Sequence, residues 1–523
     1  MRSNALGLVA SLMTACSAPP GGTGDGGGGS GGDMSVGASG VSVLQHHMHA
    51  SRDGVYSDPL LTRAAAAGLH LDTSFGGALN GAVYAQPLFV DDGAGGRDRL
   101  FVVSEDNEVT AFDVGGAVVW RKDKTVLGNP ATASALPCGN IKPTLGITGT
   151  PVIDLPSRTL FFGAMTETLA GAARTHHQLI FGLSIDDGST RPGFPIDVGA
   201  SFASQSFDAA VQGQRGALVI VGSTLYVPYG GMYGDCGAYH GWVVAVPLGD
   251  PAAVKGWHTA APEAGIWAPG GLASDGTSVF AATGNAPPNT MPFGQQESIV
   301  KLGDGARFDG SGSEIFTASD WPALDTGDID IGGSGPVLID VAGRHLAVAL
   351  GKNGKAYLLD RDNLGHKTAG QSDGLASASV SAGEIINAAA AYTTAQASYV
   401  VFKAPCKSGG GRLQAFKIGG GAAAAPTIDL AGGWCADHKG DGSPMVSTRD
   451  GTSDAIVWAV GTESEGGAGD GRLHGFDADT GAVLFAGGGT GDKMGQVRRF
   501  STPIVAKGRI FVAGDGKLYA FRP

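Results

Sequence analysis

Charged residues are scarce in this sequence of 523 residues, at 16 %, and aromatic residues are scarcer still, at 7 %. Helix-rich proteins usually carry many ion pairs on their helix surfaces, so this composition argues against a helical fold. Positive charge is the scarcer sign, with 35 Lys and Arg against 48 Asp and Glu, a formal net charge of −13. This acidic balance argues against a nucleic-acid partner, which requires a basic face.

Several chemical signatures are absent. The chain has no adjacent pair of cysteines and no C-x-x-C-H motif for haem attachment. It also has no G-x-S-x-G nucleophile motif, and Gly333-Ser334-Gly335 lies at the start of an expected strand rather than at a strand-to-helix elbow. No apolar run is long enough to span a bilayer as a stable helix. A hydrolase and a covalently attached haem acceptor are therefore poorly supported.

Glycine, by contrast, is abundant, with 89 residues. The stretch 146–189 shows how it is used, because three short apolar runs at 150–153, 159–163 and 178–185 are separated by Pro, Ser, Gly or Asp. Short β-branched and aromatic runs with such punctuation predict consecutive antiparallel strands. A three-stranded meander cannot bury its faces alone, so the unit is expected to repeat.

The repeat is visible in the segments that open each unit, which contain a small residue and usually a proline. They are residues 85–87, 149–151, 215–217, 268–270, 334–336, 390–392, 442–444 and 501–503. Their spacing of roughly sixty residues is somewhat longer than a typical propeller blade. We therefore predict an all-β fold, a single eight-bladed β-propeller over residues 41–523, in which 146–189 is the second blade.

An open ring would leave sheet edges unpaired. The chain ends at residues 517–523, which form a third strand with no fourth. We expect an N-terminal strand, around residues 41–49, to supply the missing outer strand and close the ring.

The N-terminus has the features of an exported protein. Residues 1–16 carry Arg2, an apolar run and then Met13-Thr14-Ala15-Cys16, which looks like a bacterial lipobox with Cys16 as the lipidated residue. An ordinary signal peptide is the alternative. Residues 17–40 are a flexible Gly/Ser-rich linker. We expect a monomeric lipoprotein anchored in the cell envelope, at the outer membrane or cell surface rather than the inner membrane.

Four cysteines remain if Cys16 is lipidated, and an even number in an exported chain favours disulfides. Three pairings are open from the sequence. Cys406 with Cys435 is the first expectation, because both should lie in loops one blade apart, and Cys138 with Cys236 then follows. Free buried thiols are the alternative.

Two segments, 473–483 and 109–120, resemble the A-x-D-x-x-T-G-x-x-x-W signature of pyrroloquinoline-quinone-like (PQQ-like) propeller repeats. In that family the Gly makes the turn between the third and fourth strands and the Trp docks between blades. Further segments are similar to exported bacterial PQQ-like repeat proteins: 84–88, 146–154, 235–242, 265–267, 282–285 and 357–362. The resemblance covers about residues 41–523 and implies an eight-bladed propeller.

The resemblance also implies a cofactor hypothesis. In quinoprotein alcohol dehydrogenases, PQQ lies over the axis between a Trp and a disulfide of adjacent cysteines, with a calcium ion and an Asp base. Here the corresponding expectations are Asp330 as the base, calcium at Asp328, Asp330 and Asn285, and cofactor contacts from Trp267, Arg215, Lys352, Arg499 and Thr148. These roles are the alternative; the preferred interpretations are structural, a blade-docking Trp and turn carboxylates that cap backbone N–H groups.

Two aromatic and histidine clusters are further candidates. Tyr239, His240 and Trp242 are expected to line the funnel of the propeller, with a loop-bonded His240 as the alternative. His46, His47 and His49, with His176 and His177, raise the possibility of metal binding. On a strand, His47 and His49 would share a face, although no further ligand has suitable spacing, so a row of surface histidines is the preferred interpretation.

Three functions follow from these patterns. The leading one is a non-catalytic module that binds a protein, peptide or glycan on a propeller face, as in the outer-membrane assembly lipoprotein of this repeat type. The alternative is a PQQ- and calcium-dependent oxidoreductase of alcohols, sugars or amines. The third is a structural propeller within a larger envelope assembly.

Overall fold

The computed structural model describes residues 42–92, 97–205, 207–365, 373–421, 424–464, 467 and 469–523. Cys16 and the linker at 17–40 lie outside the described residues. Within the described ranges, no helix is both long enough and apolar enough to cross a membrane.

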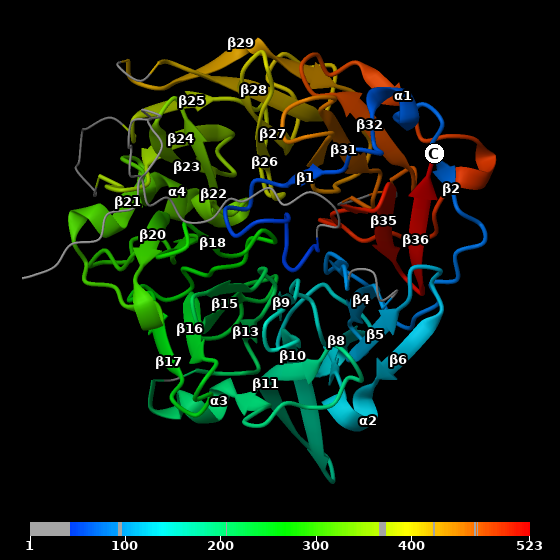
Figure 1. Ribbon diagram of the computed structural model, residues 1–523. Helices are drawn as coiled ribbons and strands as arrows, with labels where there is room; N and C mark the ends of the chain where they lie inside the picture. The colour runs from blue at the N-terminus through cyan, green and yellow to red at the C-terminus, as the bar shows by residue number, and fades with distance from the viewer. Residues whose placement is uncertain are drawn as a thin grey trace, which may run out of the picture. The chain divides into compact units, whose positions relative to one another are not determined.

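Eight blades surround a central axis, and each consists of four antiparallel strands (Figure 1). The first blade consists of β3 (Leu88–Val90), β4 (Arg99–Ser104), β5 (Glu108–Phe112) and β6 (Val118–Lys122), and the second of β9 (Val152–Asp154), β10 (Thr159–Ala170), β11 (Ala173–Ser184) and β12 (Ile196–Asp197). The third consists of β14 (Val219–Val221), β15 (Thr224–Gly231), β16 (Trp242–Pro247) and β17 (Lys255–His258), and the fourth of β18 (Ala273–Ser274), β19 (Val279–Ala282), β20 (Ser298–Leu302) and β21 (Ile315–Thr317).

The fifth blade consists of β22 (Val337–Val341), β23 (Arg344–Leu350), β24 (Lys355–Asp360) and β25 (Ala376–Ser379), and the sixth of β26 (Ala390–Thr393), β27 (Ser398–Lys403), β28 (Leu413–Gly419) and β29 (Thr427–Ala436). The seventh consists of β30 (Met445–Thr448), β31 (Ile456–Val460), β32 (Leu473–Asp477) and β33 (Val483–Phe485), and the eighth of β34 (Ile504–Ala506), β35 (Arg509–Gly514) and β36 (Lys517–Arg522) with β2 (His70–Leu71). The predicted opening segments precede or enter the first strands, so the predicted fold is confirmed.

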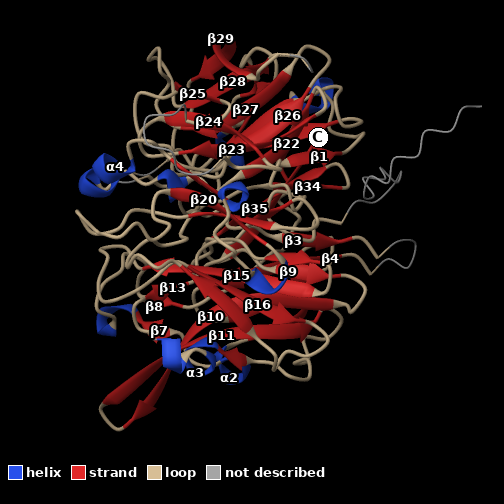
Figure 2. Cartoon of the chain, turned by 90° about the vertical axis from the view of Figure 1, so that its left-hand side faces the viewer, coloured by secondary structure: helices blue, strands red, loops and turns tan. Residues whose placement is uncertain are grey.

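Smaller elements lie between the blades. They are β1 (Val55–Ser57), β7 (Ala131–Thr132), β8 (Thr144–Leu145), β13 (Gln212–Gly213), the α-helices α1 (Arg63–Ala66), α2 (Lys124–Leu127), α3 (Val198–Ser201) and α4 (Trp321–Gly327), and the 3-10 turns η2 (Ala133–Ala135), η3 (Ala203–Gln205), η4 (Asp304–Ala306), η5 (Gly312–Glu314), η6 (Ile331–Gly333) and η7 (Thr490–Asp492). The hairpin of β10 and β11 is twelve residues long on each side and projects well beyond its blade (Figure 2).

The segment 43–58, which we call the plug, crosses the centre of the ring (Figure 1). Its backbone forms hydrogen bonds with the first strands of six blades, at Phe89, Ile153, Ser274, Leu338, Ala391 and Val446. Arg52 reaches a seventh blade by donating to the carbonyl of Leu218 at 2.7 Å, and Asp58 reaches the eighth by accepting from the N–H of Gly508 at 2.6 Å. The plug therefore contacts every blade of the ring.

An N-terminal strand closes the ring, as predicted, but its residues differ from those expected. The outer strand of the last blade is β2 (His70–Leu71), which pairs with β36. Residues 41–49 were expected in that position, whereas residues 43–49 belong to the plug. They form turns there, with left-handed φ values of 53° at His47 and 68° at Met48, which a strand does not allow.

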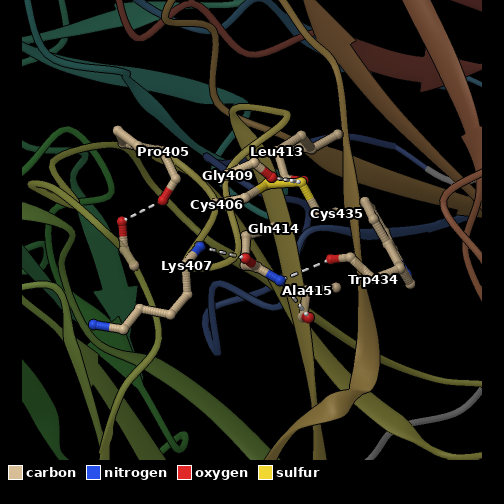
Figure 3. Close-up of a disulfide and its surroundings, with 10 residues drawn as sticks. Pro405, Cys406, Lys407, Gly409, Leu413, Gln414, Ala415, Trp434 and Cys435 are labelled. Atoms are coloured by element: carbon tan, nitrogen blue, oxygen red, sulfur yellow. Dashed lines mark hydrogen bonds between the residues drawn. A yellow bond between two sulfur atoms is a disulfide. The ribbon is translucent and has the colours of Figure 1, made fainter.

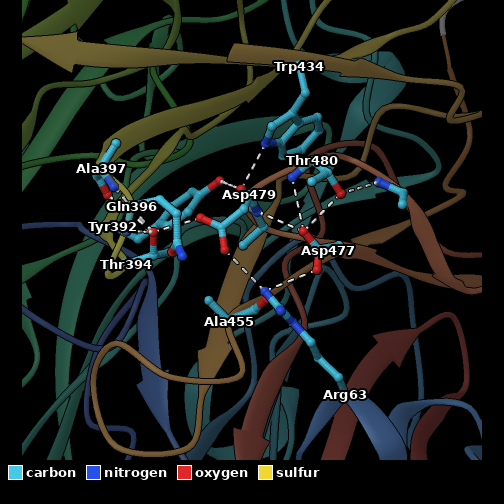
Figure 4. Close-up of polar contacts among 12 residues, drawn as sticks. Arg63, Tyr392, Thr394, Gln396, Ala397, Trp434, Ala455, Asp477, Asp479 and Thr480 are labelled. Atoms are coloured by element: carbon cyan, nitrogen blue, oxygen red, sulfur yellow. Dashed lines mark hydrogen bonds and ion pairs between the residues drawn. The ribbon is translucent and has the colours of Figure 1, made fainter. Parts of the chain in front are cut away.

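Neighbouring blades dock through the Trp and Gly of the repeat signature. The Nε1 of Trp434 donates to the carbonyl of Ala478 at 2.8 Å (Figure 4), and a Cβ at Gly481 would lie 2.7 Å from the same ring. Trp120 repeats the arrangement, donating to Ile185 at 3.0 Å beside Gly188. Glycine is required in both turns because the indole occupies the space of a side chain and φ is positive.

Two disulfides join the pairs predicted first, Cys406–Cys435 and Cys138–Cys236. The first pair lies within one blade, between the β27–β28 loop and β29 (Figure 3), rather than one blade apart as expected. The second pair joins the loop after η2 to the loop after β15.

Arg52 is the plug residue whose loss should cost most. Its guanidinium is buried and donates to the carbonyls of His46, Leu218 and Leu272 at 2.7–2.8 Å. The variant Arg52→Met leaves these acceptors without a charged donor, so we expect the free energy of unfolding to fall by about 3 kcal/mol or more.

Urea unfolding of Arg52→Met and of Arg509→Met measures this effect. Arg509 donates to one carbonyl, that of Val114, at an exposed site, and its variant should unfold within about 1 kcal/mol of the parent. Equal midpoints for the two variants would contradict the role assigned to the plug.

Candidate functional site

A cavity of about 460 Å³ lies at the centre of the ring, and we call it the axial cavity. Its lining includes Arg215, Trp267, Asp330, Glu384 and Arg499, from the connections that lead into the first strands of five blades. A smaller cavity shares Arg215 and Phe500 with it and is also lined by His46 of the plug. The plug therefore borders the smaller cavity that adjoins the axial cavity.

Most residues of the quinone and calcium hypothesis meet in this cavity. The lining contains Arg215, Trp267, Asn285, Asp328, Asp330, Lys352 and Arg499. Thr148 lies in the smaller cavity, where its hydroxyl faces Glu105 and burial raises the pKa of that carboxyl to about 7. Residues almost three hundred positions apart in the sequence are thus brought to one site.

Lys352 and Asp330 form the central ion pair of the site. Their Nζ and Oδ2 atoms are 2.5 Å apart, and Lys352 also lies 3.0 Å from Oδ1 of Asp328. The side chain of Asp330 is 4 % exposed, whereas that of Asp328 is 69 % exposed. Burial opposes the charge of Lys352, but the two carboxylates outweigh it and raise the pKa of the ammonium.

The second oxygen of Asp330 is also occupied. Oδ1 accepts hydrogen bonds from the backbone N–H of Asn285 at 2.9 Å and from Nε1 of Trp267 at 3.4 Å. Gly284 makes this approach feasible, since a Cβ there would lie only 2.3 Å from Oδ1. Trp267 therefore belongs to the cavity wall and not to a blade-docking contact of the kind made by Trp434.

Arg215 differs from the other cations of the cavity. Its guanidinium lies 5.2 Å from the centre of the Trp267 ring, and Nζ of Lys352 lies 5.6 Å from the same ring. No hydrogen bond or ion pair joins Arg215 to any described residue, although Asp235, Tyr239 and Asp330 are near enough to act on its charge. Burial is the largest influence and lowers the pKa of Arg215. Arg215 thus presents donors to whatever enters the cavity.

The predicted aromatic cluster separates in the structure. Tyr239 lines the axial cavity and donates to Oδ1 of Asp235 at 2.7 Å. His240 instead bonds to loop carbonyls, those of Thr259 and Ala261, which is the alternative that the sequence left open. Trp242 was expected in the funnel but is fully buried in the core of its blade, because its face packs against Phe202.

The histidine clusters also differ from expectation. His46 and His47 are buried in the plug with their rings stacked at 4.3 Å, so these two histidines are not part of the expected surface row. His49 bonds to Asp53, and His177 on β11 bonds to Asp197. Among the described residues, no group of three His, Cys, Asp or Glu could hold a metal ion.

Glu297 is a buried carboxyl that the sequence did not reveal. Its Oε2 accepts from the N–H of Ile331, the residue after Asp330, at 2.7 Å. Desolvation, reinforced by the charge of Asp330, raises the pKa of Glu297 to about 10. It is therefore protonated at neutral pH and holds the segment that carries Asp330. The run Gln295-Gln296-Glu297 carries no motif that indicates this role.

The residues fit the calcium and quinone arrangement incompletely. Calcium takes six to eight oxygen ligands, but both oxygens of Asp330 are already engaged by nitrogen donors. The ring of Trp267, the expected stacking surface, is in contact with Arg215 and Lys352. The adjacent-cysteine disulfide has no counterpart in the sequence. The cationic side chains of the cavity suit an anionic ligand. The residues expected to bind calcium, in contrast, do not leave the oxygens of Asp330 available to the ion.

Structural comparison shows the same fold in quinoproteins. Quinohemoprotein alcohol dehydrogenase from Comamonas testosteroni is similar with a TM-score of 0.60 and 15 % identity, over 92 % of this chain and 80 % of that one. A europium-containing methanol dehydrogenase has a TM-score of 0.57 and 14 % identity, over 91 % and 90 % of the two chains. These similarities confirm the PQQ-like propeller fold and, at such low identity, nothing finer.

BamB from Moraxella catarrhalis has a TM-score of 0.45 and 14 % identity, over 87 % of this chain and 98 % of that one, which supports no inference. No protein-family profile and no curated protein sequence matches the chain.

Glu297 should make stability depend on pH. Because its folded-state pKa is raised above the ordinary value of 4.5 to about 10, the folded protein keeps a proton that the unfolded chain releases. This contribution is full below about pH 4.5 and is lost as the pH rises toward 10, with a slope of at most about 1.4 kcal/mol per pH unit.

The variant Glu297→Gln keeps an acceptor for Ile331 and releases no proton. Unfolding free energies measured in urea between pH 6 and 9 should fall less steeply for the variant than for the parent. Identical slopes would contradict the buried, protonated state of Glu297.

Proposed function

We propose that the protein is a non-catalytic binding module whose axial cavity takes a carboxylate-bearing ligand. The observation that carries this proposal is Arg215, a half-buried guanidinium that faces the cavity and has no ion-pair partner among the described residues. A guanidinium binds a carboxylate through two parallel hydrogen bonds, and burial strengthens them.

The rest of the cavity supports a ligand of moderate size. Its volume of about 460 Å³ lies within the range of small-molecule sites. Trp267, Tyr239, Tyr233 and Phe500 supply aromatic surface, and Tyr233 is 57 % exposed. Aromatic rings beside an unpaired cation suit the end of a peptide or the acidic sugar of a glycan. Lipidation at Cys16 would hold such a module at the envelope, with the outer membrane as the proposed site.

A PQQ-dependent oxidoreductase is the second candidate. It is favoured by the meeting of Trp267, Asn285, Asp330 and Lys352 in the same cavity. Arg215, Lys352 and Arg499 would hold the carboxylates of the quinone, which would supply two-electron oxidation chemistry when bound, and Asp330 would serve as the base. Both oxygens of Asp330 are already engaged by nitrogen donors, which argues against binding of the calcium ion that quinoprotein alcohol dehydrogenases use.

Calorimetric titration of the purified protein tests both candidates. The probes are acetyl-alanyl-alanine for a peptide carboxylate, glucuronate for a glycan, and PQQ with and without calcium. We expect the parent to bind at least one of the first two, and Arg215→Gln to weaken that binding about tenfold or more.

Lys417→Met is the matched control, because Nζ of Lys417 lies over the ring of Tyr399 at 5.6 Å but does not line the cavity. It should bind like the parent. Saturable PQQ binding with dye reduction in the presence of an alcohol would favour the oxidoreductase instead. Absence of saturable binding for every probe, or equal affinity of Arg215→Gln and the parent, would overturn the binding proposal.

A further inference from the structure

A second cavity of about 570 Å³ adjoins the axial cavity and shares Glu384, Ile386 and Arg499 with it. We call it the side cavity. It lies mainly between the sixth and seventh blades, where Lys403 ends β27, Arg412 precedes β28, and residues 437–441 connect β29 to β30. Its lining is distinct from the residues of the quinone hypothesis except for Arg499.

Cations gather in the side cavity around one carboxylate. Asp441 lies 3.4 Å from Nζ of Lys403, 3.8 Å from Arg412 and 3.7 Å from Arg499. Lys403 is 2 % exposed, whereas the side chain of Arg412 is 52 % exposed. With exposed Lys439, four cationic side chains line the cavity against three carboxylates, those of Asp441, Glu384 and Asp437.

The backbone fixes the centre of this cluster. The carbonyl of Asp441 accepts from Nδ2 of Asn387 at 2.6 Å and from the N–H of Phe500 at 2.9 Å, and its N–H donates to Thr462 at 3.0 Å. Two blade connections and the β31–β32 loop thus hold Asp441 in place. The four cationic side chains of the lining exceed its three carboxylates by one.

His438 is the observation that indicates a ligand. It lines the side cavity at 2 % exposure, and the backbone of Val460 lies close enough to act on its ring. Neither ring nitrogen, however, makes a hydrogen bond of normal geometry to any described residue. Its ring packs edge-on against His474, whose Nε2 bonds to Asp470 at 2.9 Å. Burial, with the charges of His474 and Lys403, lowers the pKa of His438 to about 3.

A neutral imidazole offers one donor and one acceptor. A buried polar group without a partner is costly, and a ligand that satisfies both nitrogens recovers that cost. A hydroxyl group can donate to one histidine nitrogen or accept from the other. The cations beside His438 require negative charge on the same ligand.

We infer that the side cavity is a second binding site, for an oxyanion that carries a neighbouring hydroxyl, as in a sugar phosphate or a sugar acid. Lys403, Arg412 and Arg499 contact the oxyanion, and His438 contacts the hydroxyl. This inference is independent of what the axial cavity binds.

Titration calorimetry with glucose 6-phosphate, glucuronate and inorganic phosphate tests the site, in the parent and in Arg215→Gln. We expect saturable binding of glucose 6-phosphate or glucuronate at a site whose affinity Arg215→Gln leaves within about twofold, whereas glucuronate held in the axial cavity would be the separate component that Arg215→Gln weakens. Which of the two binds more tightly identifies phosphate or carboxylate as the preferred oxyanion. Inorganic phosphate, which has no sugar hydroxyl, should bind more weakly than glucose 6-phosphate.

Variants separate the parts of the site. Arg412→Gln, at a half-exposed position that tolerates substitution, and Lys403→Met should each weaken binding about tenfold or more. His438→Phe keeps a buried ring and should remove the preference for glucose 6-phosphate over inorganic phosphate. Lys301→Met is the control, because Lys301 donates to the carbonyl of Arg361 and lines neither cavity.

Two results would overturn the inference. One is the absence of saturable binding of both sugar probes to the folded parent. The other is binding to Arg412→Gln, confirmed as folded by its melting temperature, with the affinity of the parent. If Arg215→Gln alone abolished binding, the probe would occupy the axial cavity, and the side cavity would again have no assigned ligand.

Discussion

The hydrogen bonds of the plug to the first strands are the constraint on which the rest of the molecule depends. A propeller leaves the inner edges of its blades facing the axis, and unpaired backbone groups there are costly. In this protein, the backbone of residues 43–58 pairs with the first strands of six blades, and the buried guanidinium of Arg52 binds the carbonyls of Leu218 and Leu272. His46 of the same segment lines the smaller cavity that adjoins the axial cavity.

Much of the ring could be predicted from the sequence because its signals are local. Small residues and prolines mark each crowded start of a blade, and the Trp and Gly of the repeat signature fit against each other in two interfaces. The closing strand could not be placed in the same way. β2 has only two residues, His70 and Leu71, and is defined by pairing with β36 rather than by any pattern of its own.

The axial site was partly predictable for a different reason. Trp267 and Asn285 stand in segments that resemble a known repeat, and the structure brings them together with Asp330 and Lys352. Glu297, Lys403 and His438 could not be identified, because their properties come from burial where distant blades meet. Trp242 shows the converse case, since its place in a distinctive aromatic motif reflects packing in the core of a blade.

Arg215 is the proposed centre of recognition in the axial cavity. A crystal structure of the protein soaked with acetyl-alanyl-alanine tests this most directly. We expect density in the axial cavity with a carboxylate about 3 Å from the Arg215 guanidinium. Clear density for the ligand at another place, with Arg215 facing only protein and solvent, would contradict it.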